Sequence, residues 1–94
     1  MTSEKILEAA GDCKRLLVAR NIPSARFPAD SFPDLESETL AHTHYMLDEI
    51  INVFIPADRR EKAFRWLGFV QGVLWSKKLL VIADLKNQNR PASN

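Results

Sequence analysis

The chain has little of the residues that build disulfide frameworks, metal clusters or flexible linkers. Among its 94 residues there are one cysteine, Cys13, and three glycines. One cysteine excludes an intramolecular disulfide and a cysteine-ligated metal cluster, so we expect an intracellular protein in which Cys13 is a buried structural thiol. Apolar runs are only a few residues long, which excludes a membrane-spanning helix. The first residues also lack the basic and then apolar pattern of a signal peptide, and we therefore expect a cytoplasmic location.

The composition is that of a small folded globule. Hydrophobic residues make up 46% of the chain and charged residues 27%, which predicts a single domain over residues 1–94. A domain of this size buries a modest core, and self-association is a common way of adding stability, so we expect a homo-oligomer. The net charge of +1 does not favour a nucleic-acid partner.

Charge is unevenly distributed along the chain. Residues 1–27 carry a net charge of +2, residues 28–58 carry −7 with no lysine or arginine, and residues 59–94 carry +6. This asymmetry predicts that the acidic middle packs against the basic end, within one chain or between subunits.

Helical periodicity dominates the sequence. Apolar residues recur at helical spacing over residues 3–20, 35–55 and 59–77, and a short helix is expected over 82–88. We expect Thr2 or Ser3 to cap the first helix, Asp34 or Ser37 the second, and Asp58 the third. The predicted fold is therefore an all-α bundle of three main helices and a short C-terminal helix, with a loose tail over residues 90–94.

A long proline-rich loop is predicted between the first two helices, over residues 21–34. An apolar residue precedes each of its three prolines: Ile22, Phe27 and Phe32. Since a residue before proline favours an extended backbone, we expect this segment to be pinned to the helices by these side chains.

The segment 59–77 is apolar around most of its circumference, which predicts a helix buried on more than one side. Gly68 and Gly72 share one face and each weakens the helix by about 1 kcal/mol, so a close neighbour is expected there. That neighbour could be another helix of the chain, a second subunit or a ligand. Phe69 and Trp75 add large surfaces suited to the core or to an oligomer interface.

Basic residues gather at the start of the same helix, where they oppose the helix dipole. The cluster comprises Arg59, Arg60, Lys62 and Arg65, and Trp66 follows it. Two explanations remain open. The cluster could pair with Asp48 or Glu49 of the acidic second helix, or it could bind a small anionic ligand or an acidic partner protein.

No motif in the sequence predicts catalysis, a cofactor or a metal. His42 and His44 lie two residues apart on a helix and point to nearly opposite sides, so they cannot share a metal ion. We expect each to form an ordinary surface pair with an acidic residue.

Residues 39–91 resemble small uncharacterised proteins of tailed bacteriophages and prophages. The pattern is carried by EKAFRWLGFVQGVLW at 61–75 and ADLKNQNRP at 83–91, preceded by Leu40-Ala41-His42 and Tyr45-Met46. This resemblance implies a phage origin and no particular chemistry. Val81 stands where these proteins often carry a capping threonine or serine.

A second, more distant similarity is to the helical hairpin of phage anti-CBASS cyclic-nucleotide sponges. It is carried by Ile55-Pro56, Arg60-Glu61 and Trp75, with one additional residue in the turn. The middle of the third helix departs from that pattern, and no ligand-binding residue can be carried over.

The sequence thus favours a non-enzymatic phage accessory protein that oligomerises and binds a host protein or a small anionic ligand, in host takeover or anti-defence. One alternative is a small DNA-associated regulator, based on the basic C-terminal segment. Another is a helical nucleotide-pyrophosphohydrolase, although the acidic residues lack the paired spacing that binds magnesium for that reaction.

Overall fold

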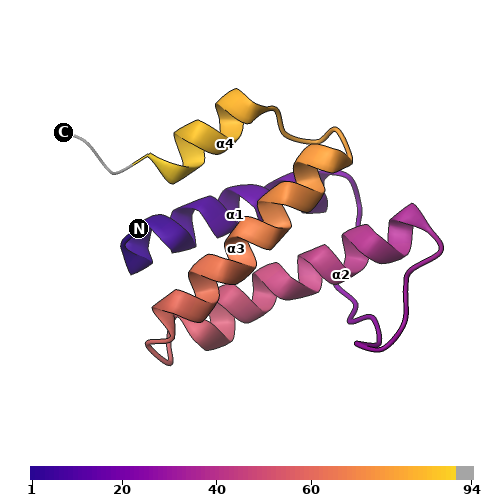
Figure 1. Cartoon of the computed structure of the whole chain (residues 1–94), viewed down its shortest axis with the longest axis horizontal. Coiled ribbons are helices and arrows are strands. Elements are labelled where there is room, and N and C mark those ends of the chain that lie inside the picture. The colour runs from indigo at the N-terminus through magenta and orange to yellow at the C-terminus, as the bar shows by residue number, and fades with distance from the viewer. Residues whose placement is uncertain (91–94) are drawn as a thin grey trace.

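A computed structural model describes residues 1–90, which form four α-helices around one apolar core (Figure 1). The helices are α1 (Ser3–Ala19), α2 (Glu36–Glu49), α3 (Arg60–Ser76) and α4 (Ile82–Asn89), and a π-helix, Ile50–Phe54, continues α2. No strand occurs in residues 1–90, so the predicted all-α fold is confirmed, with its long loop and short last helix. Most of the predicted tail lies outside the described residues.

The first two helices begin with different caps. The side-chain oxygen of Thr2 accepts a hydrogen bond from the Lys5 amide at 3.1 Å, as predicted for α1. At α2 the expected caps are wrong, because Leu35 occupies the N-cap position. The carboxylate of Glu38 compensates by accepting hydrogen bonds from the amides of Asp34 and Leu35, at 3.2 and 3.0 Å.

Asp58 does not cap α3, because it closes the helix that precedes it. Its backbone is left-handed, with φ 59°, and its amide donates to the carbonyl of Ile55 at 3.0 Å. The next amide, that of Arg59, donates to Phe54 at 2.8 Å, so that the two bonds form the motif that commonly ends helices. Arg59 consequently becomes the N-cap of α3. Asn21 and Lys78, with φ 59° and 66°, end α1 and α3 in the same way.

The core is built from one apolar stripe on each main helix. These stripes comprise Ile6, Ala10, Cys13 and Leu17 of α1, Leu47 and Ile50 of α2 and its π-helical extension, and Ala63, Leu67, Val70 and Leu74 of α3, all fully buried. Cys13 is among them, as predicted, and burial raises the pKa of its thiol to about 11. Each large aliphatic side chain buried here stabilises the fold by roughly 1.5–3 kcal/mol.

Within one copy of the described chain, α3 is not buried on more than one side. Its inner face packs on α1 and α2, but Phe64, Phe69 and Trp75 are about half exposed, at 47%, 58% and 53%. Gly68 and Gly72 have no close neighbour among residues 1–90, because a methyl group placed on either would meet none of their atoms within 4 Å. The physical reason is that α4 packs on α1 and leaves the outer face of α3 open; in Figure 1, α3 crosses in front of α1.

Polar side chains tie α4 to α3. The amide nitrogen of the buried Gln71 donates to Gln88 at 3.1 Å and to Asn89 at 2.8 Å, and Asn89 donates back to Gln71 at 3.2 Å. The last helix is thus held by side-chain hydrogen bonds at its C-terminal end, and none of its own residues is fully buried. None of the described helices is long and apolar enough to cross a membrane.

Candidate ligand-binding pocket

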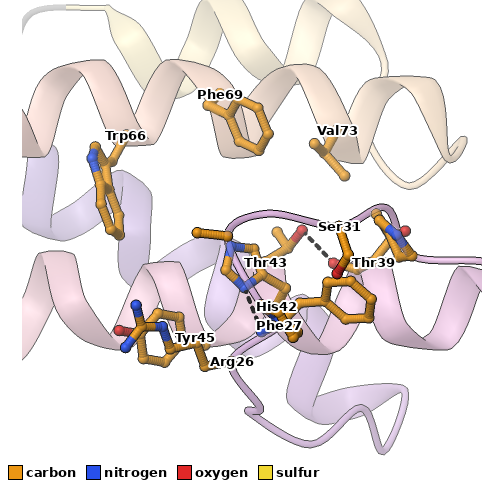
Figure 2. A pocket seen from close by; sticks show the side chains of 13 residues that line it. Arg26, Phe27, Ser31, Thr39, His42, Thr43, Tyr45, Trp66, Phe69 and Val73 are labelled. Carbon is orange, nitrogen blue, oxygen red and sulfur yellow. Dashed lines mark hydrogen bonds between the residues drawn. The ribbon is translucent and has the colours of Figure 1, made fainter.

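A cavity of about 420 Å³ lies between the 26–33 part of the loop, α2 and α3 (Figure 2). The α3 wall is formed by Trp66, Phe69 and Val73, whose side chains extend toward α2 and the loop. The opposite walls come from the loop (Arg26, Phe27, Pro28, Ala29, Ser31 and Pro33) and from α2 (Thr39, His42, Thr43 and Tyr45). This volume falls in the range of about 300–1,000 Å³ that is usual for small-molecule sites.

Hydrogen bonds from α2 position the loop. The carbonyl of Ile22 bonds to Nδ1 of His44 at 2.8 Å, the amide of Ala25 donates to the carbonyl of Ala41 at 3.1 Å, and the amide of Phe27 donates to Nδ1 of His42 at 3.0 Å. Ile22 and Phe27 are half-buried against the helices, as predicted. Phe32 is not, since it is 89% exposed. Among the described residues, no hydrogen bond joins residues 28–33 to α2 between those of Phe27 and Asp34, so none draws Phe32 inward.

The two histidines do not form the surface pairs with acidic residues that we expected. His44 is buried and binds the loop carbonyl, and His42 accepts the Phe27 amide (Figure 2). Accepting that bond requires Nδ1 of His42 to carry no proton. Burial lowers the pKa of His42, and the nearby charge of Arg26 lowers it further. His42 is therefore neutral at pH 7, with its remaining ring N–H available as a donor.

Trp66 joins the pocket to the start of α3. Its ring stands edge-on to Phe54, with centroids 4.7 Å apart, and the ammonium group of Lys62 lies 5.5 Å from its ring centre and 4.7 Å from that of Phe54. Such cation–aromatic contacts contribute about 0.5–1 kcal/mol at exposed sites. They hold the positive charge of Lys62 one helical turn before Trp66, which is part of the pocket wall.

The electrostatic character of the pocket is that of a hydrogen-bond donor site. Among the residues that line the pocket, Arg26 carries a full positive charge and none is acidic. Burial raises the pKa of Tyr45, and a hydrogen bond involving Glu49 raises it further, so its phenol stays protonated. The cavity therefore combines apolar and aromatic walls with a guanidinium, an imidazole N–H and hydroxyl groups.

A second hollow, of about 460 Å³, lies at the start of α3. It is lined by the four basic residues of the predicted cluster, Arg59, Arg60, Lys62 and Arg65, and by the acidic residues Asp58 and Glu61. No acidic side chain of residues 1–90 forms a salt bridge with any of the four. Arg60 donates instead to the carbonyl of Met1 at 3.2 Å.

The predicted pairing of this cluster with Asp48 or Glu49 is wrong. Asp48 pairs with Lys14 of α1, and although burial raises the pKa of Asp48, the hydrogen bonds from Lys14 and Ser24 outweigh this and lower it. The net charges of the segments predicted an α2–α3 attraction, but an ion pair depends on which side chains meet across the helices. At Asp48, the acidic helix α2 faces Lys14 of α1 and not the basic cluster of α3.

The structure brings together only part of the predicted site. The four basic residues share one hollow, whereas Trp66 and Phe69 line the other pocket, and Gly68, Gly72 and Trp75 lie on exposed positions of α3. The pocket also contains residues that the sequence did not single out as a site, foremost Arg26, Phe27, Thr39 and Tyr45. The Phe27-Pro28 pair was their only signal, because it predicted a loop held against the helices.

Among residues 1–90, no group of three or more His, Cys, Asp or Glu side chains is placed to hold a metal ion. Comparison with known proteins adds no further assignment: no family model, no curated protein and no solved structure matches this chain.

Proposed function

We propose that this protein is a non-enzymatic binding protein of the accessory kind encoded by tailed bacteriophages and prophages, acting in the host cytoplasm. Its partner is a host protein or a small anionic ligand. One observation carries the proposal: an aromatic-lined pocket and a basic hollow adjoin on α3, and Lys62 and Trp66 connect them. The phage origin is supported by the sequence pattern of residues 39–91.

Both surfaces have the properties of binding sites. Aromatic and arginine side chains contribute most of the energy in many interfaces, and concave apolar pockets with a few polar groups hold most small ligands. Basic side chains that lack acidic partners in the described chain attract an anion without first breaking an existing ion pair. A partner with an acidic group next to an apolar anchor would use both surfaces.

A binding role fits the polar groups of the pocket better than a catalytic one. The basic nitrogen of His42 already accepts the Phe27 amide, and the hydroxyl of Thr43 donates to the carbonyl of Thr39 at 2.8 Å. A general base needs a free nitrogen within reach of the proton that it removes, and a nucleophilic hydroxyl needs a neighbouring base. His42 and Thr43 do not meet these requirements, because both are already engaged with the backbone.

The test combines two assays on the purified chain. One is capture of partners from bacterial lysate, and the other is a thermal-shift screen of nucleotides and cyclic nucleotides. We expect Arg60→Glu with Arg65→Glu to abolish the capture or the shift. The matched control, Lys77→Glu with Lys86→Glu, makes the same change in charge outside the hollow and should retain it. Equal loss in both variants, or no ligand in either assay, would contradict the proposal.

The proposal includes self-association through the exposed face of α3. Phe64 and Trp75 flank Gly68 and Gly72 there, and half-exposed aromatic side chains offer on the order of 100 Å² each. These side chains are the centre of such a contact and not the whole of it, since a specific interface usually buries about 800 Å² per partner, so we expect weak association, at tens of micromolar. Size-exclusion chromatography with light scattering measures it, and a monomer at that concentration would refute this part.

A further inference from the structure

We propose that the pocket between the loop, α2 and α3 binds small aromatic anions, with the ring between the apolar walls and the anionic group toward Arg26. This inference rests on the proposed binding function and names the ligand class. It follows from which groups line the cavity, where they point, and which of them already have partners.

The walls select a flat ring. Trp66 and Phe69 of α3 face Phe27 of the loop and Tyr45 of α2 across the cavity (Figure 2). Trp66 is braced by its edge-on contact with Phe54, and Tyr45 lies beside the His42 ring, with centroids 5.6 Å apart. Rings held in this way lose little side-chain freedom when a ligand stacks between them. An aromatic body is therefore favoured over a flexible aliphatic chain of similar size.

The polar groups select a negative charge. Arg26 lines the cavity and forms no salt bridge with an acidic residue of the described chain. His42 offers its remaining ring N–H, because its other nitrogen accepts the Phe27 amide. Lys62 adds a cation 5.5 Å from the centre of the Trp66 ring. Because the lining offers these donors and contains no carboxylate, an anionic group gains hydrogen bonds that a neutral ring cannot make.

The charges around the pocket leave the anionic group one favourable end. The Tyr45 hydroxyl is already engaged in a hydrogen bond with Glu49, so it is not the donor that meets the anion. Arg26 lines the cavity, its guanidinium is drawn beside Tyr45 in Figure 2, and its charge lowers the pKa of both Tyr45 and His42. We therefore assign the anion to the Arg26 side of the cavity and the ring to the space below Trp66 and Phe69.

Two fluorescent probes of nearly the same shape test this assignment. Anilinonaphthalenesulfonate carries an anionic sulfonate, and phenylnaphthylamine is the same aromatic amine without it. The chain should bind the sulfonate more tightly than the neutral probe, and Arg26→Gln should reduce that preference by about threefold to fivefold. Arg26→Lys should retain most of it. Arg20→Gln removes an exposed cation that does not line the pocket, and should leave the preference unchanged.

The binding site is located by the two tryptophan indole N–H signals in an NMR spectrum, assigned with Trp75→Phe. Sulfonate binding in the pocket should shift the Trp66 signal and leave that of Trp75 in place, because Trp75 lies outside the lining. Val73→Phe narrows the cavity and should weaken both probes by at least about tenfold, with circular dichroism reporting that the variant folds.

The possible outcomes test the anion assignment and the binding function of the pocket separately. Equal affinity for the two probes, or equal losses in Arg26→Gln and Arg20→Gln, would overturn the anion assignment and leave the pocket as a binding site. A shift of Trp75 alone would move the site to the outer face of α3. If the folded wild-type chain bound neither probe, both the ligand class and the binding function of the pocket would be rejected.

Discussion

Replacing Gly68 or Gly72 with alanine should stabilise the isolated chain. Both residues lie inside α3, where glycine costs about 1 kcal/mol relative to alanine because its backbone loses more freedom on folding. A methyl group at either position meets nothing within 4 Å, and neither residue has a positive φ. The gain is therefore not offset by a steric clash or by backbone strain.

The expected size is about 0.5–1 kcal/mol for each substitution and nearly the sum for both, since the two positions share no neighbour. In a domain of this length, 1 kcal/mol raises Tm by roughly 4–8 °C. Thermal and guanidinium unfolding at low protein concentration, where the proposed self-association is weakest, measure the effect. Gly11→Ala is the matched control in α1, where the added methyl group would touch only the end of Arg15, at 3.5 Å.

If Gly68→Ala or Gly72→Ala destabilised the chain while Gly11→Ala stabilised it, the conclusion that the outer face of α3 is open would be refuted. The same variants also examine the proposed self-association. If a second copy packs against these glycines, the added methyl groups should weaken the oligomer while stabilising the monomer, and the two effects separate through their dependence on protein concentration.

Three other predictions concern the helix end, the loop and the thiol. Lys78→Gly should stabilise the chain by about 1 kcal/mol in guanidinium unfolding, because Lys78 has a φ of 66° that glycine adopts without strain; Lys78→Ala, which keeps the strain, should give no such gain. Because the pKa of His42 is lowered on folding, its bond to the Phe27 amide contributes stability above the ordinary pKa near 6.5 and is lost as pH falls through the lowered value. This contribution of His42 to the free energy of unfolding should disappear from neutral to mildly acidic pH, and a His42→Gln variant with the same pH slope over that range would disprove this. The Cys13 thiol, fully buried and with a pKa raised to about 11, should resist alkylation in the folded chain and react at once in guanidinium, as followed by mass spectrometry; fast labelling of the native chain would contradict its burial.

Several features of the fold could be predicted from the sequence because they depend on local spacing. The stripe through Ile6, Cys13 and Leu17 places one face of α1 in the core whatever it packs against, and Thr2 caps its own helix through a contact three residues away. The loop follows from its prolines, which prevent helix formation there. Periodicity and backbone chemistry act over a few residues, so the helices, their order and most of the buried faces could be predicted without the fold.

Other features were decided only by the tertiary structure, because they depend on which surfaces meet. Asp58 has the chemistry of a cap, but the end of the preceding helix required its left-handed backbone. The net charge of α2 predicted pairing with α3, but Lys14 of α1 is the cation that reaches Asp48. Gly68 and Gly72 signalled a close neighbour, yet α4 lies on α1 and leaves them uncovered.

The pocket is the clearest case of such a long-range effect. Phe27, Tyr45 and Trp66 are separated by many residues, and no spacing rule connects them. They meet because His42 accepts a hydrogen bond from the Phe27 amide and so holds the loop against α2, opposite α3. Sequence patterning determined the elements and their apolar faces, whereas the packing of helices and loop decided which side chains share a cavity, since that depends on contacts between distant parts of the chain.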